Sequence, residues 1–160
     1  MSRTVGESIE VRTAPLDARE ARELIAALNA ELLSLYPPEQ CFHDLDKEEV
    51  TPGRGRFVLA WEDGVALGCG AVRMIDDERA ELKRMYVVPE RRGRGISRAV
   101  LASLEAAARE LGARSIVLET GIHQPVAISL YESSAYQRVP CFGAYASSPT
   151  SICMEKQLTS

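Results

Sequence analysis

The chain of 160 residues has no long apolar segment, no internal repeat and no low-complexity run. No stretch approaches the roughly 18 apolar residues of a membrane helix, so a membrane protein is not expected. Residues 1–7 lack the apolar core of a secretory signal, so none is predicted. The net charge of −4 argues against a nucleic-acid binder, whose surface is normally basic.

Cysteine is also sparse and scattered. Cys41, Cys69, Cys141 and Cys153 form no C-x-x-C pair, so the sequence predicts neither a metal site nor a disulfide framework. This usage is typical of a reducing compartment, and we expect a cytoplasmic protein. With 46% hydrophobic and 26% charged residues, the chain has the composition of a globular protein. Its length predicts a single domain over residues 1–160.

The most informative stretch of the chain is residues 81–111. Residues 81–88 form a β-prone run that Pro89 ends, and an apolar stripe from Val100 to Leu111 predicts a helix that Gly112 stops. The intervening loop contains two glycines and several arginines. A glycine-rich loop before a helix is an anion site, because the first backbone N–H groups of the helix lack partners and glycine lets a phosphate approach. The alternative is a solvated basic loop.

Two motifs resemble the GNAT superfamily of N-acetyltransferases. The run Arg92-Gly93-Arg94-Gly95-Ile96-Ser97 resembles its Q/R-x-x-G-x-G/A acetyl-CoA loop, with Ser97 in place of the usual glycine or alanine. Residues 124–136 resemble its N-x-x-A-x-x-L-Y-x-x-x-G-F segment. Ala127, Leu130 and Tyr131 match, whereas Gln124 replaces asparagine and Ala135 replaces glycine. The second replacement suggests a slightly different turn into the next strand.

The order of predicted elements agrees with this resemblance. Strands are expected at 9–12, 56–61, 65–74, 80–88, 115–120, 135–139 and 151–156, and helices at about 15–35, 98–111 and 125–132. The order β-α-β-β-β-α-β-α-β-β is that of the GNAT fold, an α/β (α+β) architecture. The resemblance therefore implies a mixed, mostly antiparallel sheet of about seven strands flanked by helices.

The resemblance implies acetyl-CoA as co-substrate, no metal, and direct transfer to an amine. The residues that would bind the cofactor are Met85, Tyr86 and Val87 beside pantetheine, Arg92, Gly93, Arg94, Gly95, Ile96 and Ser97 around the diphosphate, and Gln124. Tyr131 would protonate the leaving thiolate, and Glu81 would act as base. Tyr131 could instead be a core aromatic and Glu81 an ordinary strand residue. Glu119 and His123 are other candidate bases.

The acceptor side is less well specified. The polar segment 37–55 is predicted to form a lid over the substrate. Candidate acceptor contacts are Tyr36, His43, Arg84, Glu119, Phe142 and Tyr145, with Arg84 as a holder of a carboxylate. Tyr36 and His43 could equally pack or face water.

Three functions remain open at this point. The first is acetylation of a small-molecule amine, which the segments 37–55 and 140–149 favour because they predict a closed pocket. The second is acetylation of a protein lysine or N-terminus. The third is a binding module that senses acetyl-CoA without turnover. A homodimer is compatible with the resemblance, although the sequence shows no diagnostic seam.

Overall fold

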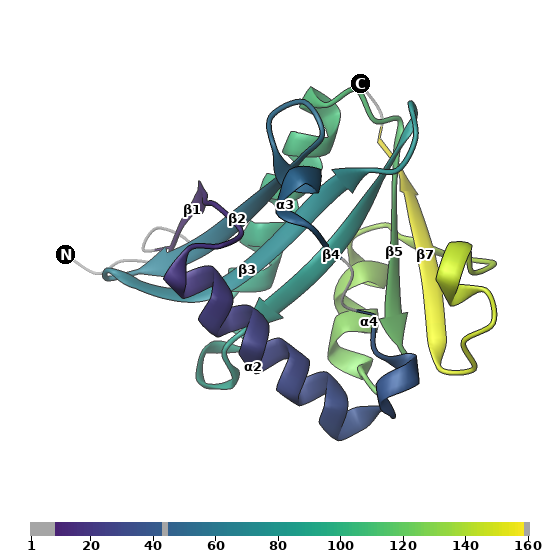
Figure 1. The fold of residues 1–160 in the computed structure, drawn as a ribbon, viewed down its shortest axis with the longest axis horizontal. Helices are drawn as coiled ribbons and strands as arrows, with labels where there is room; N and C mark the ends of the chain where they lie inside the picture. Colours follow the sequence, from purple (N-terminus) through teal and green to yellow (C-terminus); the bar gives the residue numbers. More distant parts are fainter. Residues whose placement is uncertain (1–8, 43–44, 159–160) are drawn as a thin grey trace.

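The computed structural model describes residues 9–42 and 45–158, which form one seven-stranded sheet between two layers of helices (Figure 1). The strand order is β1-β2-β3-β4-β5-β7-β6, and only the β4–β5 pair is parallel. The strands are β1 (Ile9–Thr13), β2 (Gly55–Glu62), β3 (Val65–Met74), β4 (Arg79–Val87), β5 (Ser115–Gly121), β6 (Gln137–Val139) and β7 (Ser151–Gln157). The predicted order of elements and the mixed, mostly antiparallel sheet are confirmed.

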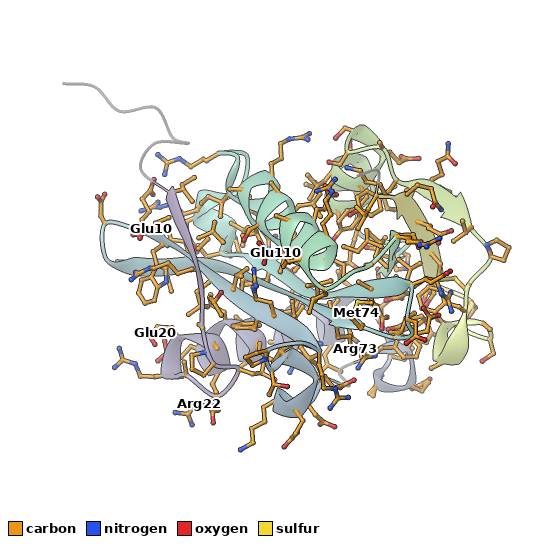
Figure 2. The ribbon with its side chains drawn as sticks, turned by 90° about the horizontal axis from the view of Figure 1, so that it is seen from above. Glu10, Glu20, Arg22, Arg73, Met74 and Glu110 are labelled. Atoms are coloured by element: carbon orange, nitrogen blue, oxygen red, sulfur yellow. A yellow bond between two sulfur atoms is a disulfide. The ribbon has the colours of Figure 1, made fainter. Side chains whose placement is uncertain are left out.

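Helices cover both faces of this sheet. They are α2 (Arg19–Leu35), α3 (Ile96–Glu110) and α4 (Pro125–Ser133), with short 3-10 turns at Pro38–Gln40, Lys47–Val50, Pro89–Arg91 and Gly143–Tyr145. Figure 2 shows Glu20 and Arg22 of α2 on one side of the sheet and Glu110 of α3 on the other. None of the helices within the described residues is long and apolar enough to cross a membrane.

Each face of the sheet has its own apolar core. Val100, Leu101 and Leu104 of α3 pack with Tyr131 of α4 on one face. Leu24 and Leu28 of α2 pack on the other face with apolar residues of β2 and β3. Amphipathic helices bury one stripe in this way, and Val100, Leu101 and Leu104 of the stripe predicted for α3 are buried.

The β4–β5 pair opens toward its carboxyl end (Figure 1). Pairing runs from Arg79–Ser115 to Leu82–Leu118 and then stops, although both strands continue. In the same region the pairing of β4 with β3 passes from Ala71–Lys83 to Cys69–Tyr86, so β4 carries one extra residue there. Arg84 has a φ of 58°, which is unusual for a residue other than glycine. The bulge bends β4 away from β5 and leaves an opening between them.

Near the C-terminal end of the described chain, two expectations need correction. Cys141 and Cys153 form a disulfide, although the sequence predicted no disulfide framework. Their separation of 12 residues hides the pairing, but the β6–β7 hairpin pairs Val139 with Cys153 and brings the Cα atoms of the two cysteines within 5.0 Å. The strand predicted at 135–139 begins only at Gln137, because Ala135 has a φ of 75° and lies in a turn.

Candidate active site

A cavity of about 570 Å³ lies at the opening between β4 and β5. We distinguish two ends by the residues that line them. The loop end is lined by Met85–Val87, Arg91–Gly93, Ile96, Ser97 and Gln124. The aromatic end is lined by Phe42, Lys83, Arg84, Glu119 and Tyr145. Tyr131 and His123 also line the cavity, so most residues predicted for the site do meet in one place.

The loop end is built from the turn that precedes α3. Gly93 and Gly95 have φ angles of 80° and 85°, and Gly95 is the N-cap of the helix. Both lie in the left-handed region that glycine tolerates best, and a Cβ at either position would meet no atom within 4 Å. The glycines are therefore required by the backbone path, which directs the unpaired N–H groups of the first helical turn outward.

The arginines of this loop are held by the protein itself. Arg92 donates through Nε to the Val87 carbonyl at 2.9 Å, forms an ion pair with Glu31 at 2.8 Å and stacks over the Tyr86 ring. Arg98, in the first turn of α3, donates to the Ser133 hydroxyl at 2.8 Å. Arg94 and Gly95 are absent from the described cavity lining, so they shape the turn and its charge from outside the cavity. Arg92 also fixes the loop against β4 and α2.

Gln124, at the loop end, is held by a small hydrogen-bond network. Its Oε1 accepts hydrogen bonds from the Gly121 N–H at 3.1 Å and from the Tyr36 hydroxyl at 3.2 Å. The Tyr36 hydroxyl in turn accepts from the His123 N–H at 3.1 Å. A Cβ on residue 121 would lie 1.8 Å from that hydroxyl, so Gly121 is needed for this close approach. Tyr36 therefore ties the end of α2 to the β5–α4 loop and lies outside the main cavity.

Tyr131 is buried on α4, with 6% of its surface exposed, and contributes to the cavity wall. Its ring packs edge-to-face on Tyr136 at 5.7 Å, and no described residue hydrogen-bonds its hydroxyl. Burial, with a smaller contribution from the charge of Glu119, raises the pKa of the Tyr131 hydroxyl above its ordinary value. The hydroxyl therefore keeps its proton at neutral pH, as a proton donor must.

Glu81 and Glu119 occupy different environments. Glu81 is only 2% exposed, pairs with Arg73 at 2.9 Å and accepts the Tyr145 hydroxyl at 2.7 Å. It is not among the described residues that line the cavity. Glu119 lines the cavity and accepts a hydrogen bond from the Ser151 hydroxyl at 2.7 Å. Burial raises the pKa of the Glu119 carboxyl above its ordinary value, an effect that the Ser151 bond and the charge of Lys83 partly offset.

The aromatic end contains two residues that sequence reasoning missed. Lys83 donates to the Tyr145 hydroxyl at 3.2 Å, and the Phe42 ring meets the Tyr145 ring edge-on at 4.8 Å. Phe42 was detectable only as an aromatic residue in a polar loop, and Lys83 only as a lysine within a strand. Phe142 packs behind Tyr145 at 5.3 Å but is absent from the described lining. His43, predicted as an acceptor contact, lies outside the described residues.

No group of three or more potential metal-ligating residues gathers within the described ranges.

Comparison with known proteins identifies the family. Residues 21–136 match the Acetyltransferase (GNAT) family. The chain is 39% identical over 138 residues to the IAA acetyltransferase of Azospirillum brasilense, covering 85% of this chain and 89% of that protein. The chain belongs to the GNAT family and is an acyltransferase. Members of this family use acetyl-CoA as acetyl donor.

Solved structures agree in fold. A protein of Klebsiella pneumoniae subsp. pneumoniae MGH 78578, provisionally assigned as an acyl-CoA N-acyltransferase, superposes with a TM-score of 0.82 at 34% identity; the match covers 94% of this chain and 98% of that one. The PaiA N-acetyltransferase of Thermoplasma acidophilum, solved in complex with coenzyme A, gives a TM-score of 0.72 at 21% identity. That match covers 94% of this chain and 99% of the other. The second likeness concerns the fold alone.

Proposed function

We propose that this protein transfers the acetyl group of acetyl-CoA to a primary amine of a small molecule while both are bound. The observation that carries the proposal is the continuous cavity between β4 and β5, which joins the glycine loop to Tyr131, Glu119 and an aromatic wall. One end offers backbone N–H groups suited to phosphate, and the other end offers buried polar side chains. The two ends meet where β4 and β5 part.

Acetyl-CoA supplies the activated acetyl group, and the residues around the opening supply the proton transfers. Glu119 accepts a proton from the acceptor amine, because it lines the cavity whereas Glu81 is engaged by Arg73 beneath Tyr145. Tyr131 donates a proton to the departing thiolate, since its hydroxyl is protonated and borders the same cavity. Backbone N–H groups at the bulge of β4 polarise the carbonyl that is attacked.

The aromatic end favours a small acceptor over a polypeptide. Phe42 and Tyr145 wall this end, and Phe142 supports Tyr145 from behind. The segment that carries Phe42 is fastened by a hydrogen bond of 2.7 Å between Thr150 and Gln40, and the Cys141–Cys153 disulfide anchors the segment that carries Tyr145. Aromatic side chains held in place by such contacts suit a compact ligand better than an extended polypeptide.

The test is to follow thiol release from acetyl-CoA against amino acids, polyamines, aromatic amines and lysine peptides. Release that depends on a small amine supports the proposal, whereas release with peptides alone would replace the small acceptor by a protein. If acetyl-CoA binds but no acceptor of the panel causes thiol release, the proposed reaction is contradicted.

A matched pair of variants tests the base. Glu119→Gln is expected to lower kcat by about 100-fold, within the usual range for general bases, whereas His123→Gln is expected to leave it nearly unchanged. Because the base must be ionised, kcat/KM of the wild type should fall as the pH drops through the raised pKa of Glu119. This acidic limb should disappear in Glu119→Gln. If Glu119→Gln keeps the acidic limb of the pH profile, another group is the general base.

A further inference from the structure

Two serines form a hydrogen-bonded chain that ends on Glu119. The Ser151 hydroxyl lies 2.7 Å from Oε2 of Glu119 and 2.7 Å from the Ser148 hydroxyl. A hydroxyl has one hydrogen and an ionised carboxylate can only accept, so Ser151 donates to Glu119 and accepts from Ser148. Hydrogen bonds in such a chain polarise one another, and a bond to a charged acceptor is stronger than a neutral one. The chain therefore favours the ionised form of Glu119.

The backbone around the two serines fixes their place relative to β5. Ser151 begins β7, and the β5–β7 register sets Glu119 opposite Cys153, so Glu119 and Ser151 are diagonal neighbours on one face of the sheet. The chain turns between the two serines, and the Ser151 N–H meets the Ser148 carbonyl at 3.5 Å. The Cys141–Cys153 disulfide closes this segment, and the Cys141 sulfur lies 3.7 Å from the Ser151 carbonyl oxygen.

The other oxygen of Glu119, Oε1, accepts no hydrogen bond from any residue in the described ranges 9–42 and 45–158. Because Glu119 lines the cavity, Oε1 is the oxygen available to the acceptor. The other ionisable groups around Glu119 are Lys83 and Glu81 of β4, Tyr131 of α4, Tyr36 at the end of α2, Cys41 after the Pro38–Gln40 turn, and Arg84 and His123 of the cavity wall. Among the described residues, the Ser151 hydroxyl bonds only Glu119 and Ser148, so its removal leaves those groups in place.

We propose that Ser151, supported by Ser148, is a positioning residue that directs Oε1 of Glu119 toward the acceptor amine. This inference rests on the proposed function, in which Glu119 is the base, and adds a residue that acts through it. Burial raises the pKa of the Glu119 carboxyl, and the bond from Ser151 opposes this effect. Without that bond the carboxylate would lose its fixed orientation and would keep a proton up to a higher pH. Less of the enzyme would then have a base ready to accept a proton from the amine.

The first test measures the pKa of Glu119 directly, by carbon-13 NMR of the side-chain carboxyl groups, with Glu119→Gln to assign the signal. In Ser151→Ala this pKa should rise by about 1, as for the loss of a hydrogen bond to a charged group. Ser151→Thr keeps the hydroxyl and should return the pKa to the wild-type value. Ser147→Ala, at an exposed serine of the same loop, is the matched control. An unchanged pKa in Ser151→Ala would overturn the inference and leave the proposed function intact.

The second test follows the pH profile of acetyl transfer in the same variants. In Ser151→Ala the acidic limb of kcat/KM should move to higher pH by as much as the NMR pKa, and Ser151→Thr should restore it. A purely structural role for Ser151 would lower the rate at every pH and leave both the limb and the pKa of Glu119 in place, which would contradict the inference. If the pKa rises but the limb stays, Ser151 controls Glu119, and the assignment of Glu119 as base in the proposed function is wrong.

Ser148→Ala provides a second variant in case Ser151→Ala does not fold. It leaves the bond to Glu119 in place and removes only the polarisation of Ser151, so the pKa of Glu119 should rise by less than in Ser151→Ala. An unchanged pKa in Ser148→Ala would contradict the support assigned to Ser148. Unchanged acetyl-CoA affinity, measured by calorimetry, verifies that each variant folds. The NMR titration needs no acceptor, so it decides the role of Ser151 even if no amine is acetylated.

Discussion

The two ends of the cavity are built in different ways. The loop end comes mostly from one contiguous stretch, residues 85–97, and depends on backbone conformation at Gly93 and Gly95. The aromatic end assembles side chains from four distant segments, among them Phe42, Glu119 and Tyr145. A backbone motif can be predicted from a sequence because residues close together in the chain specify it. A wall of distant side chains depends on how strands and loops pack, which no local pattern in the sequence specifies.

The largest effect is expected at Tyr131, which lines the cavity together with both ends. Tyr131→Phe should lower kcat by about 100-fold or more, as for the loss of a general acid, and leave the Kd for acetyl-CoA within about twofold. Stopped-flow or steady-state thiol release measures the first quantity and calorimetry the second. Tyr136→Phe is the matched control, because its hydroxyl bonds Glu105 at 2.7 Å and should matter for stability alone. Wild-type turnover in Tyr131→Phe would reduce Tyr131 to a packing residue.

The next largest effect tests the loop end. Gly95→Asp introduces strain at a φ of 85° and a negative charge where phosphate is expected, so the Kd for acetyl-CoA should rise about 100-fold. Gly53→Asp is a matched control, since Gly53 has a φ of 87° and equally open surroundings. It lies in the turn between Lys47–Val50 and β2, which contributes no residue to the cavity lining, whereas the neighbours Gly93 and Ile96 of Gly95 do line it. An equal change of Kd in both variants would show that strain, and not the phosphate site, is responsible.

A third prediction separates stability from catalysis at the aromatic end. Glu81→Gln weakens a buried ion pair with Arg73, which then keeps Glu49 at 2.8 Å. The free energy of unfolding, measured by urea titration, should fall by about 2–3 kcal/mol. The folded enzyme should retain the acidic limb of its pH profile, in contrast to Glu119→Gln. A stable Glu81→Gln protein without turnover would restore Glu81 as the base.

The smallest effect concerns the turn that follows Tyr131. Ala135 has a φ of 75°, a conformation that costs alanine about 1–2 kcal/mol and glycine little. After the entropic cost of glycine, Ala135→Gly should stabilise the fold by about 0.5–1 kcal/mol and change neither Kd nor kcat. Ala146→Gly, at a φ of −59°, should destabilise it slightly. Thermal unfolding of both variants measures the change in stability. A lower stability of Ala135→Gly than of the wild type would contradict the strain argument.

Much of the fold was predictable because its signals are local. The stop at Pro89 and the stripe of α3 lie where the sequence placed them, and the strands expected at 56–61 and 65–74 meet at Gly64, whose positive φ suits a tight turn. Of the loop motif, Arg92, Gly93, Ile96 and Ser97 line the loop end, whereas Arg94 and Gly95 do not. The disulfide between Cys141 and Cys153 was missed because it depends on the β6–β7 hairpin, which no spacing rule describes.

The chemistry of the aromatic end could not be predicted in the same way. Glu81 and Glu119 are both glutamates within strands, and only the neighbouring Arg73 and Tyr145 make one a buried structural group. Ser151 reaches Glu119 across 32 residues of the chain only through the β5–β7 register.

By itself, the sequence determined the order of elements, the family and the glycine loop, because near neighbours in the chain specify helices, turns and backbone sites. The tertiary structure alone decided which carboxylate borders the cavity, which serine holds it and which cysteines pair. Those outcomes depend on strand register, on a single extra residue in β4 and on contacts between segments far apart in the chain.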